Sequence, residues 1–122
     1  MKYLKLFENM DKLYKQIRAT EYIDYFKEYR LDYSYISIIE KIARQCLSDK
    51  ITNILLEDGH PYIQLILNRT YIDNSRIYKI HITLLNEEYI IISLSFGNTH
   101  DRFYICDTRE GFEQFLKEVV IK

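Results

Sequence analysis

The stretch from Ile51 to Cys106 most constrains the fold, because short runs of β-branched and aromatic residues recur there between polar turns. The run from Arg76 to Leu84 alternates two sets of residues: Ile77, Lys79, His81 and Thr83 against Tyr78, Ile80, Ile82 and Leu84. Alternation with period two is typical of a β-strand with two different faces. Turn-forming DGHP, NEE and FGNTHD separate the runs. We therefore predict antiparallel strands at about 51–57, 62–68, 76–84, 88–96 and 102–106.

The residues before Ile51 show helical spacing instead. Apolar side chains repeat at three- and four-residue intervals in three segments, about 4–17, 20–30 and 34–48. Thr20 and Ser34 stand where helix-capping residues are preferred, at the starts of the second and third segments. The third stripe is the most regular: Ile36, Ile39, Ile42, Ala43, Cys46 and Leu47. Three N-terminal helices are predicted.

A last helix is predicted at about 108–120. Asp107 or Thr108 can cap it, and Asp107 with Glu110 matches a capping box. The apolar residues that follow are Phe112, Phe115, Leu116 and Val119, at positions i, i+3, i+4 and i+7. Together these patterns predict a single α+β domain over 1–122, with three N-terminal helices, an antiparallel meander of about five strands and a C-terminal helix packed on the sheet.

Composition narrows the possible partners. The chain has 122 residues, 48% of them hydrophobic and 29% charged, which is the balance of a packed globular protein. The formal net charge of −1 gives no general attraction to nucleic acid or to anionic lipid. No apolar run approaches the roughly 20 residues of a membrane span. We expect a soluble, cytoplasmic protein whose two cysteines, Cys46 and Cys106, are reduced and packed.

Four residues are candidates for catalysis. His81 and Thr83 form one H-x-T element, as in two-histidine phosphoesterases, but that chemistry needs a second copy and none is present. Cys106 lies just before a predicted helix N-terminus, which lowers thiol pKa values, and His100 could act as its base. We favour structural roles for all four. No metal-ligand spacing, phosphate loop or dinucleotide glycine cluster is found, so no metal or cofactor is implied.

The twelve tyrosines suggest binding rather than chemistry. A base-stacking surface for single-stranded nucleic acid is disfavoured, since the tyrosines follow amphipathic faces and come with as many acids as bases. Tyrosine is also enriched at protein interfaces, being large, rigid and able to hydrogen-bond. A docking patch is predicted on Tyr25, Tyr29, Tyr33 and Tyr35.

The two ends and the second and third helical segments carry a resemblance. The opening MKYLKLFEN is similar to the M-K-x-L-K-x-F-E start of small uncharacterised proteins of large tailed bacteriophages and related viruses. DKLYKQIRATEYIDYF, LDYSYISIIEKI and FYICDTREGFEQFLK resemble helix-heading, Ser-capped and closing patterns of the same group. The resemblance implies a viral origin and supplies no catalytic residue. The LFE of the opening also fits the leaders of some phage proteins loosely, but we expect this stretch to fold as part of the first helix.

Three functions follow as hypotheses. The leading one is a non-enzymatic phage or phage-like accessory protein that binds another protein, whether a host factor, a defence component or a virion part. The alternative is a bacterial toxin-immunity protein or antitoxin. A second alternative is a small phosphoesterase or nuclease centred on His81 and Thr83, or on His100 and Cys106. The partner and the oligomeric state stay open at this point.

Overall fold

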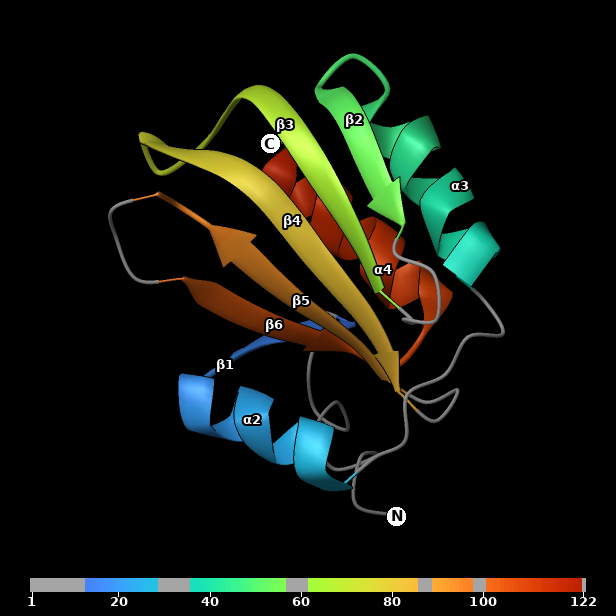
Figure 1. Ribbon diagram of the computed structural model, residues 1–122, viewed down its shortest axis with the longest axis vertical. Coiled ribbons are helices and arrows are strands. Elements are labelled where there is room, and N and C mark those ends of the chain that lie inside the picture. The colour runs from blue at the N-terminus through green and yellow to red at the C-terminus, as the bar shows by residue number, and fades with distance from the viewer. Residues whose placement is uncertain (1–12, 29–35, 57–61, 86–88, 98–100, 122) are drawn as a thin grey trace.

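The described residues form a six-stranded antiparallel sheet that carries helices on both faces (Figure 1). The computed structural model describes residues 13–28, 36–56, 62–85, 89–97 and 101–121. The elements are, in chain order, β1 (Tyr14–Ile17), α2 (Ala19–Glu28), α3 (Ile36–Leu47), β2 (Ile51–Leu56), β3 (Tyr62–Ile72), β4 (Ser75–Leu85), β5 (Tyr89–Ser95), β6 (Arg102–Cys106) and α4 (Arg109–Phe115), which continues as a π-helical turn, Leu116–Val120.

Strand order in the sheet is β1-β6-β5-β4-β3-β2. Strands β2 to β6 form a meander in which each strand pairs with its neighbour in the chain, as the sequence predicts. The first strand, β1, closes the sheet at the far edge by pairing with β6, from Tyr14 opposite Cys106 to Ile17 opposite Phe103. Strand β1 therefore lies beside β6, the strand that directly precedes the C-terminal helix.

The main core lies between the sheet and the pair formed by α3 and α4 (Figure 1). Alternate residues of the central strands point into it, so the period of two seen in the sequence becomes a continuous apolar layer. The helices contribute residues that their stripes predict, which are Ile39, Ala43, Leu47, Phe112, Phe115 and Leu116. Val120 is buried in the core, whereas the predicted Val119 is only partly buried against it. This packing confirms that the C-terminal helix covers one face of the sheet.

A smaller cluster occupies the opposite face, beneath α2. Buried residues from four strands meet there, namely Ile17, Leu85, Tyr89, Ile91 and Ile105. Tyr22 and Tyr25 of α2 pack on them, together with Phe103. Helix α2 thus covers the part of this face formed by β1, β6 and β5.

Leu13, just before β1, and Tyr14, at its start, contact the C-terminal helix through hydrogen bonds and an aromatic pair. The amide of Leu13 donates to Oε1 of Gln114 at 2.6 Å, and the hydroxyl of Tyr14 donates to Oε1 of Glu118 at 3.0 Å. The Tyr14 ring meets Phe115 edge-on, with centroids 5.7 Å apart. Gly111 faces the backbone of Leu13 so closely that a Cβ there would overlap the Leu13 carbonyl oxygen. The absence of a side chain at position 111 is what lets the strand and the helix approach.

Two predictions about the N-terminal half are wrong in detail. Residues 14–17, assigned to a first helix over about 4–17, form strand β1, and residues 4–12 lie outside the described part of the chain. The sheet consequently has six strands instead of five, and within the described residues α2 and α3 are the helices that precede the meander. Helix α2 begins at Ala19, with the Arg18 amide donating to the Glu21 carboxylate at 3.3 Å.

The hairpin of β3 and β4 is longer than predicted. Strand β3 continues past residue 68 to Ile72, and a two-residue turn at Asp73 and Asn74, both with positive φ, leads into β4. Positive φ at both positions is the type I′ geometry that suits tight hairpins. The pairing of β5 with β4 ends at Lys79, so residues 70–78 project beyond it (Figure 1).

Candidate functional site

The histidine and threonine picked out by sequence lie on the central strand β4, on the sheet face opposite α3 and α4. Pairing places His81 opposite Gln64 of β3 on one side and opposite Ser93 of β5 on the other. Directly opposed residues on one face have Cβ atoms about 4.5–5.5 Å apart. Gln64, His81 and Ser93 thus form a polar row across three strands.

His81 in this row is half-buried and its pKa is lowered, first by burial and then by the nearby charge of Lys79. The imidazole is therefore neutral near neutral pH. Thr83 is 1% exposed, and its hydroxyl has no hydrogen-bond partner among the described residues. A neutral imidazole opposite a serine hydroxyl pairs a base with a weak nucleophile, but the residue on the far side of His81 is Gln64, not a carboxylate that would orient the imidazole.

Cys106 lies at the end of β6 within the main core and is fully buried. Burial raises the pKa of its thiol well above the ordinary value, and the neighbouring Asp107 raises it further. The cap of α4 is Thr108, whose hydroxyl accepts from the Gly111 amide at 2.9 Å, so Asp107 does not hold that place. A buried, protonated thiol is a poor nucleophile. His100, its proposed base, lies outside the described residues.

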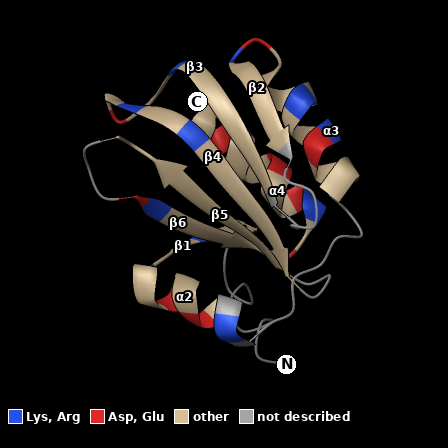
Figure 2. Cartoon of the chain, in the orientation of Figure 1, with Lys and Arg blue, Asp and Glu red and all other residues tan. Residues whose placement is uncertain are grey.

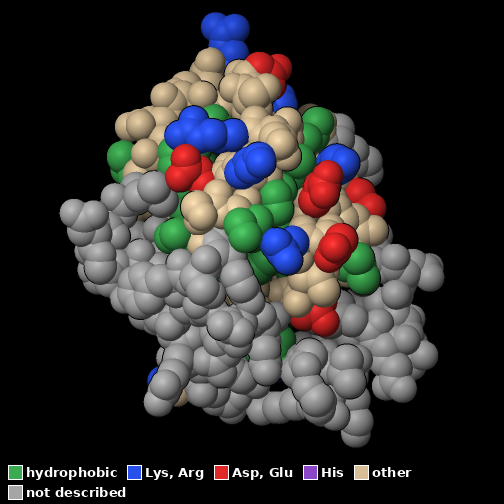
Figure 3. Space-filling model, turned by 90° about the vertical axis from the view of Figure 1, so that its right-hand side faces the viewer, with side chains coloured by type: hydrophobic (Ala, Val, Ile, Leu, Met, Phe, Trp, Pro, Cys, Tyr) green, Lys and Arg blue, Asp and Glu red, His purple; other side chains and the backbone are tan. Residues whose placement is uncertain are grey.

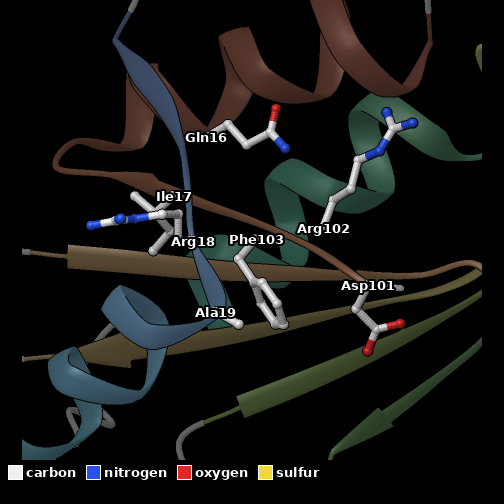
Figure 4. Close-up of a pocket in the computed structure, with 7 residues that line it drawn as sticks. All are labelled: Gln16, Ile17, Arg18, Ala19, Asp101, Arg102 and Phe103. Atoms are coloured by element: carbon white, nitrogen blue, oxygen red, sulfur yellow. The ribbon is translucent and has the colours of Figure 1, made fainter. Parts of the chain in front are cut away.

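An open cleft of about 540 Å³ lies at one end of β1 and β6 (Figure 4). Seven residues line it: Gln16, Ile17, Arg18, Ala19, Asp101, Arg102 and Phe103. Figure 4 shows Gln16 and Arg102 pointing to one side, and Phe103 and Asp101 to the other. Arg18 pairs with Glu21 at 3.2 Å and Arg102 pairs with Asp73 at 3.3 Å. The polar side chains that line the cleft point in different directions and do not converge on one point. His81, Thr83 and Cys106 are not among its lining residues.

Only Tyr25 of the predicted tyrosine patch is in the described part of the chain, since Tyr29, Tyr33 and Tyr35 lie outside it. The Tyr25 ring is half-buried and meets Tyr89 edge-on, with centroids 5.1 Å apart. Its neighbour Tyr22 packs on Phe103 at 4.3 Å, and burial raises the Tyr22 pKa to about 12. Both rings belong to the cluster under α2. Docking through the other three tyrosines stays a prediction.

A different tyrosine pair is exposed on the projecting hairpin. Tyr71 is 55% and Tyr78 46% exposed, and Arg76 lies directly opposite Tyr71. The guanidinium of Arg76 lies over the Tyr78 ring, 4.8 Å from its centroid. We call Tyr71, Arg76 and Tyr78 the hairpin patch. Sequence reasoning missed it, although the Asp73–Asn74 dipeptide between alternating residues is a recognisable turn signal.

The hairpin contrasts with the face over α3. Figure 3 shows acidic and basic side chains interspersed on that face, with hydrophobic side chains in small separate groups. Arg44 there is paired with Glu40 at 2.9 Å. Figure 2 shows Lys and Arg along the projecting end of β3 and β4, with one acidic residue at its turn. The hairpin is thus the described surface where exposed aromatic and cationic side chains coincide.

Among the residues that the structure describes, no three His, Cys, Asp or Glu side chains are grouped so that they could hold a metal ion. Nor does any described helix have the length and apolar character needed to cross a membrane. Comparisons with protein family models, with curated proteins and with solved structures find no match to this chain.

Proposed function

We propose that this protein is a non-enzymatic accessory protein of a phage or phage-like element, and that it acts by binding another protein. The observation that carries the proposal is the hairpin patch, where two exposed tyrosines flank an arginine. Tyr and Arg are the residue types enriched at the energetic centres of protein interfaces. The viral origin is supported by the resemblance of the two ends and of the second and third helical segments to small proteins of tailed bacteriophages and related viruses.

The chemistry of the described residues supports binding over catalysis. The Cys106 thiol is buried and protonated, and Thr83 is almost fully covered. The cleft at the end of β1 and β6 holds two arginines that are already paired with carboxylates. Host factors, defence components and virion parts all remain within the proposed class of partner.

Site-specific photocrosslinking in the native host tests the proposal. A photoreactive phenylalanine analogue replaces Tyr71, and the matched control carries it at Arg44, which is exposed on α3. We expect a discrete protein adduct from position 71 and none of the same mass from position 44. A catalytic turnover that His81→Ala or Cys106→Ser abolishes would refute the non-enzymatic proposal, as would identical adducts from both positions.

The patch also suits an immunity protein or antitoxin, since such proteins neutralise a toxin through a charged, aromatic face. The identity of the adduct separates the two functions. A toxin encoded beside this gene supports immunity, and a capsid, replication or host defence protein supports the phage accessory function.

A further inference from the structure

The hairpin patch has a cationic character that no described carboxylate neutralises. Arg76 is exposed, and the next exposed cations along the two strands are Arg69 and Lys79. None of the three forms an ion pair with another described residue. The one carboxylate at the tip, Asp73, is paired with Arg102 at 3.3 Å. The local charge is therefore positive although the whole chain carries −1.

Arg76 is also held in place before any partner arrives. Its guanidinium lies over Tyr78, and the Tyr78 ring in turn rests against Gly97, where a Cβ would come within 2.8 Å of Cε2. Gly97 has φ +81°, which only glycine adopts readily. A guanidinium stacked on a ring keeps its planar N–H fork free for a carboxylate, and a pre-ordered side chain loses less entropy on binding.

The hairpin that carries the patch is packed against the protein core on its other side. The opposite side of its two strands is buried, with Thr70, Ile72 and Ile77 at 1%, 7% and 0% exposure. The alternation of the strands therefore separates a side held in the core from a side presented to solvent. A partner would meet a rigid surface of two rings and a cation.

We propose that the hairpin patch binds an acidic segment of the partner protein, with a carboxylate received by Arg76 between Tyr71 and Tyr78. This inference rests on the proposed function and adds the chemistry of the partner. Paired charge-assisted hydrogen bonds to a carboxylate are among the stronger polar contacts in proteins. A nucleic acid is the less suitable occupant, because its affinity grows with the number of phosphates that are neutralised and these few cations neutralise few of them.

Fluorescence anisotropy with a labelled peptide tests the proposal directly. The probe is a short peptide in which Glu alternates with Gly and Ser, and the comparison probes replace every Glu with Gln or are an oligothymidylate of equal length. We expect the Glu peptide to bind more tightly than either at low ionic strength, and to weaken as salt is added. Arg76→Glu should weaken it by about tenfold or more, because a favourable charge contact becomes a repulsive one.

The matched control is Arg109→Glu, which makes the same change in net charge at the start of α4, away from the hairpin. Both charge-reversal variants are compared at about 0.1 M salt, where screening limits the reach of a surface charge to roughly 10 Å, so Arg109→Glu should leave the affinity within about twofold of the parent chain. Arg76→Lys keeps the charge but loses the fork, so an intermediate affinity is expected. Amide NMR spectra of each variant verify that the fold is retained.

Three results would overturn the inference: equal binding of the Glu and Gln peptides, tighter Arg76-dependent binding of the oligothymidylate, or equal losses from Arg76→Glu and Arg109→Glu. These results would not by themselves refute the proposed function, which is tested by the crosslinking experiment. If position 71 gives a specific protein adduct and any of these three results is also obtained, the hairpin binds a protein but that protein's segment is not acidic.

Discussion

Replacing Gly111 with alanine tests whether β1 is locked to the C-terminal helix. Gly111 lies within α4, where its missing side chain accommodates the Leu13 carbonyl. A Cβ at this position would also come within 3.2 Å of the Leu13 carbonyl carbon. The contact is with backbone, so the overlap is relieved only if the strand or the helix moves. Movement of β1 breaks the contacts that fasten it.

The expected magnitude follows from those contacts. The hydrogen bond from the Leu13 amide to Gln114 contributes about 1 kcal/mol, and the hydrogen bond from the Tyr14 hydroxyl to the Glu118 carboxylate about 1.5–3 kcal/mol. Each edge-on contact of the Tyr14 ring, with Phe115 and Tyr104, adds roughly 0.5–1.5 kcal/mol. Against this loss, alanine is a better helix former than glycine by about 1 kcal/mol. We expect a net destabilisation of roughly 2.5–6 kcal/mol.

Urea unfolding followed by far-ultraviolet circular dichroism measures the free energy of unfolding of each variant. Glu110→Ala, at an exposed position of the same helix, is the matched control and should change it by no more than about 0.5 kcal/mol. Tyr14→Phe removes only the hydroxyl. Combined with Gly111→Ala it should give less than the sum of the two losses, since both act through β1. A Gly111→Ala variant more stable than the parent would refute the reasoning, because helix propensity would then outweigh the overlap.

Three further outcomes are expected. The pKa of His81 is lowered in the folded state, so the unfolded chain binds a proton more readily and the free energy of unfolding should fall as pH drops below the usual histidine value of about 6.5, levelling off below the folded pKa. In His81→Gln, the urea midpoint should depend less on pH over this range; an unchanged pH dependence would contradict the assignment to His81. Thr83→Val should leave the free energy of unfolding unchanged or raise it by about 1 kcal/mol, because the buried hydroxyl lacks a described partner, whereas a clear loss would show that it has one. A thiol reagent at mildly alkaline pH should modify the half-buried Cys46 slowly and Cys106 only after unfolding; fast labelling of Cys106 in the native state would disprove its burial.

The meander could be predicted from sequence because its signals are local. Period-two alternation defines β4 and β5, and antiparallel pairing follows from short links between successive strands. The helical stripes of α3 and α4 were equally readable, since each buries the residues that its spacing places on one face. In both cases the information lies within one element and its immediate neighbours.

Strand β1 could not be predicted in the same way. Leu13, Tyr14 and Ile17 fit a helical spacing, and Tyr14 and Ile17 equally fit a short strand whose ends point to opposite faces. What decides between the two is the partner β6, nearly ninety residues later in the chain. A contact between residues so far apart in the sequence, such as that of Leu13 with Gln114, cannot be recognised from the spacing of neighbouring residues.

The hairpin patch shows the same limit for function. Polar Asn68, Arg69 and Thr70 suggest the end of a strand, yet the strand continues through a bulge at which Arg69 takes a positive φ of 48°. The pairing of Thr70 with Ile77 beyond that bulge turns Tyr71 and Arg76 to the same side. Whether these side chains are exposed depends on β5 ending its pairing at Lys79. A surface of this kind is set by the relative lengths of neighbouring strands, so its binding chemistry becomes visible only once the strands are paired.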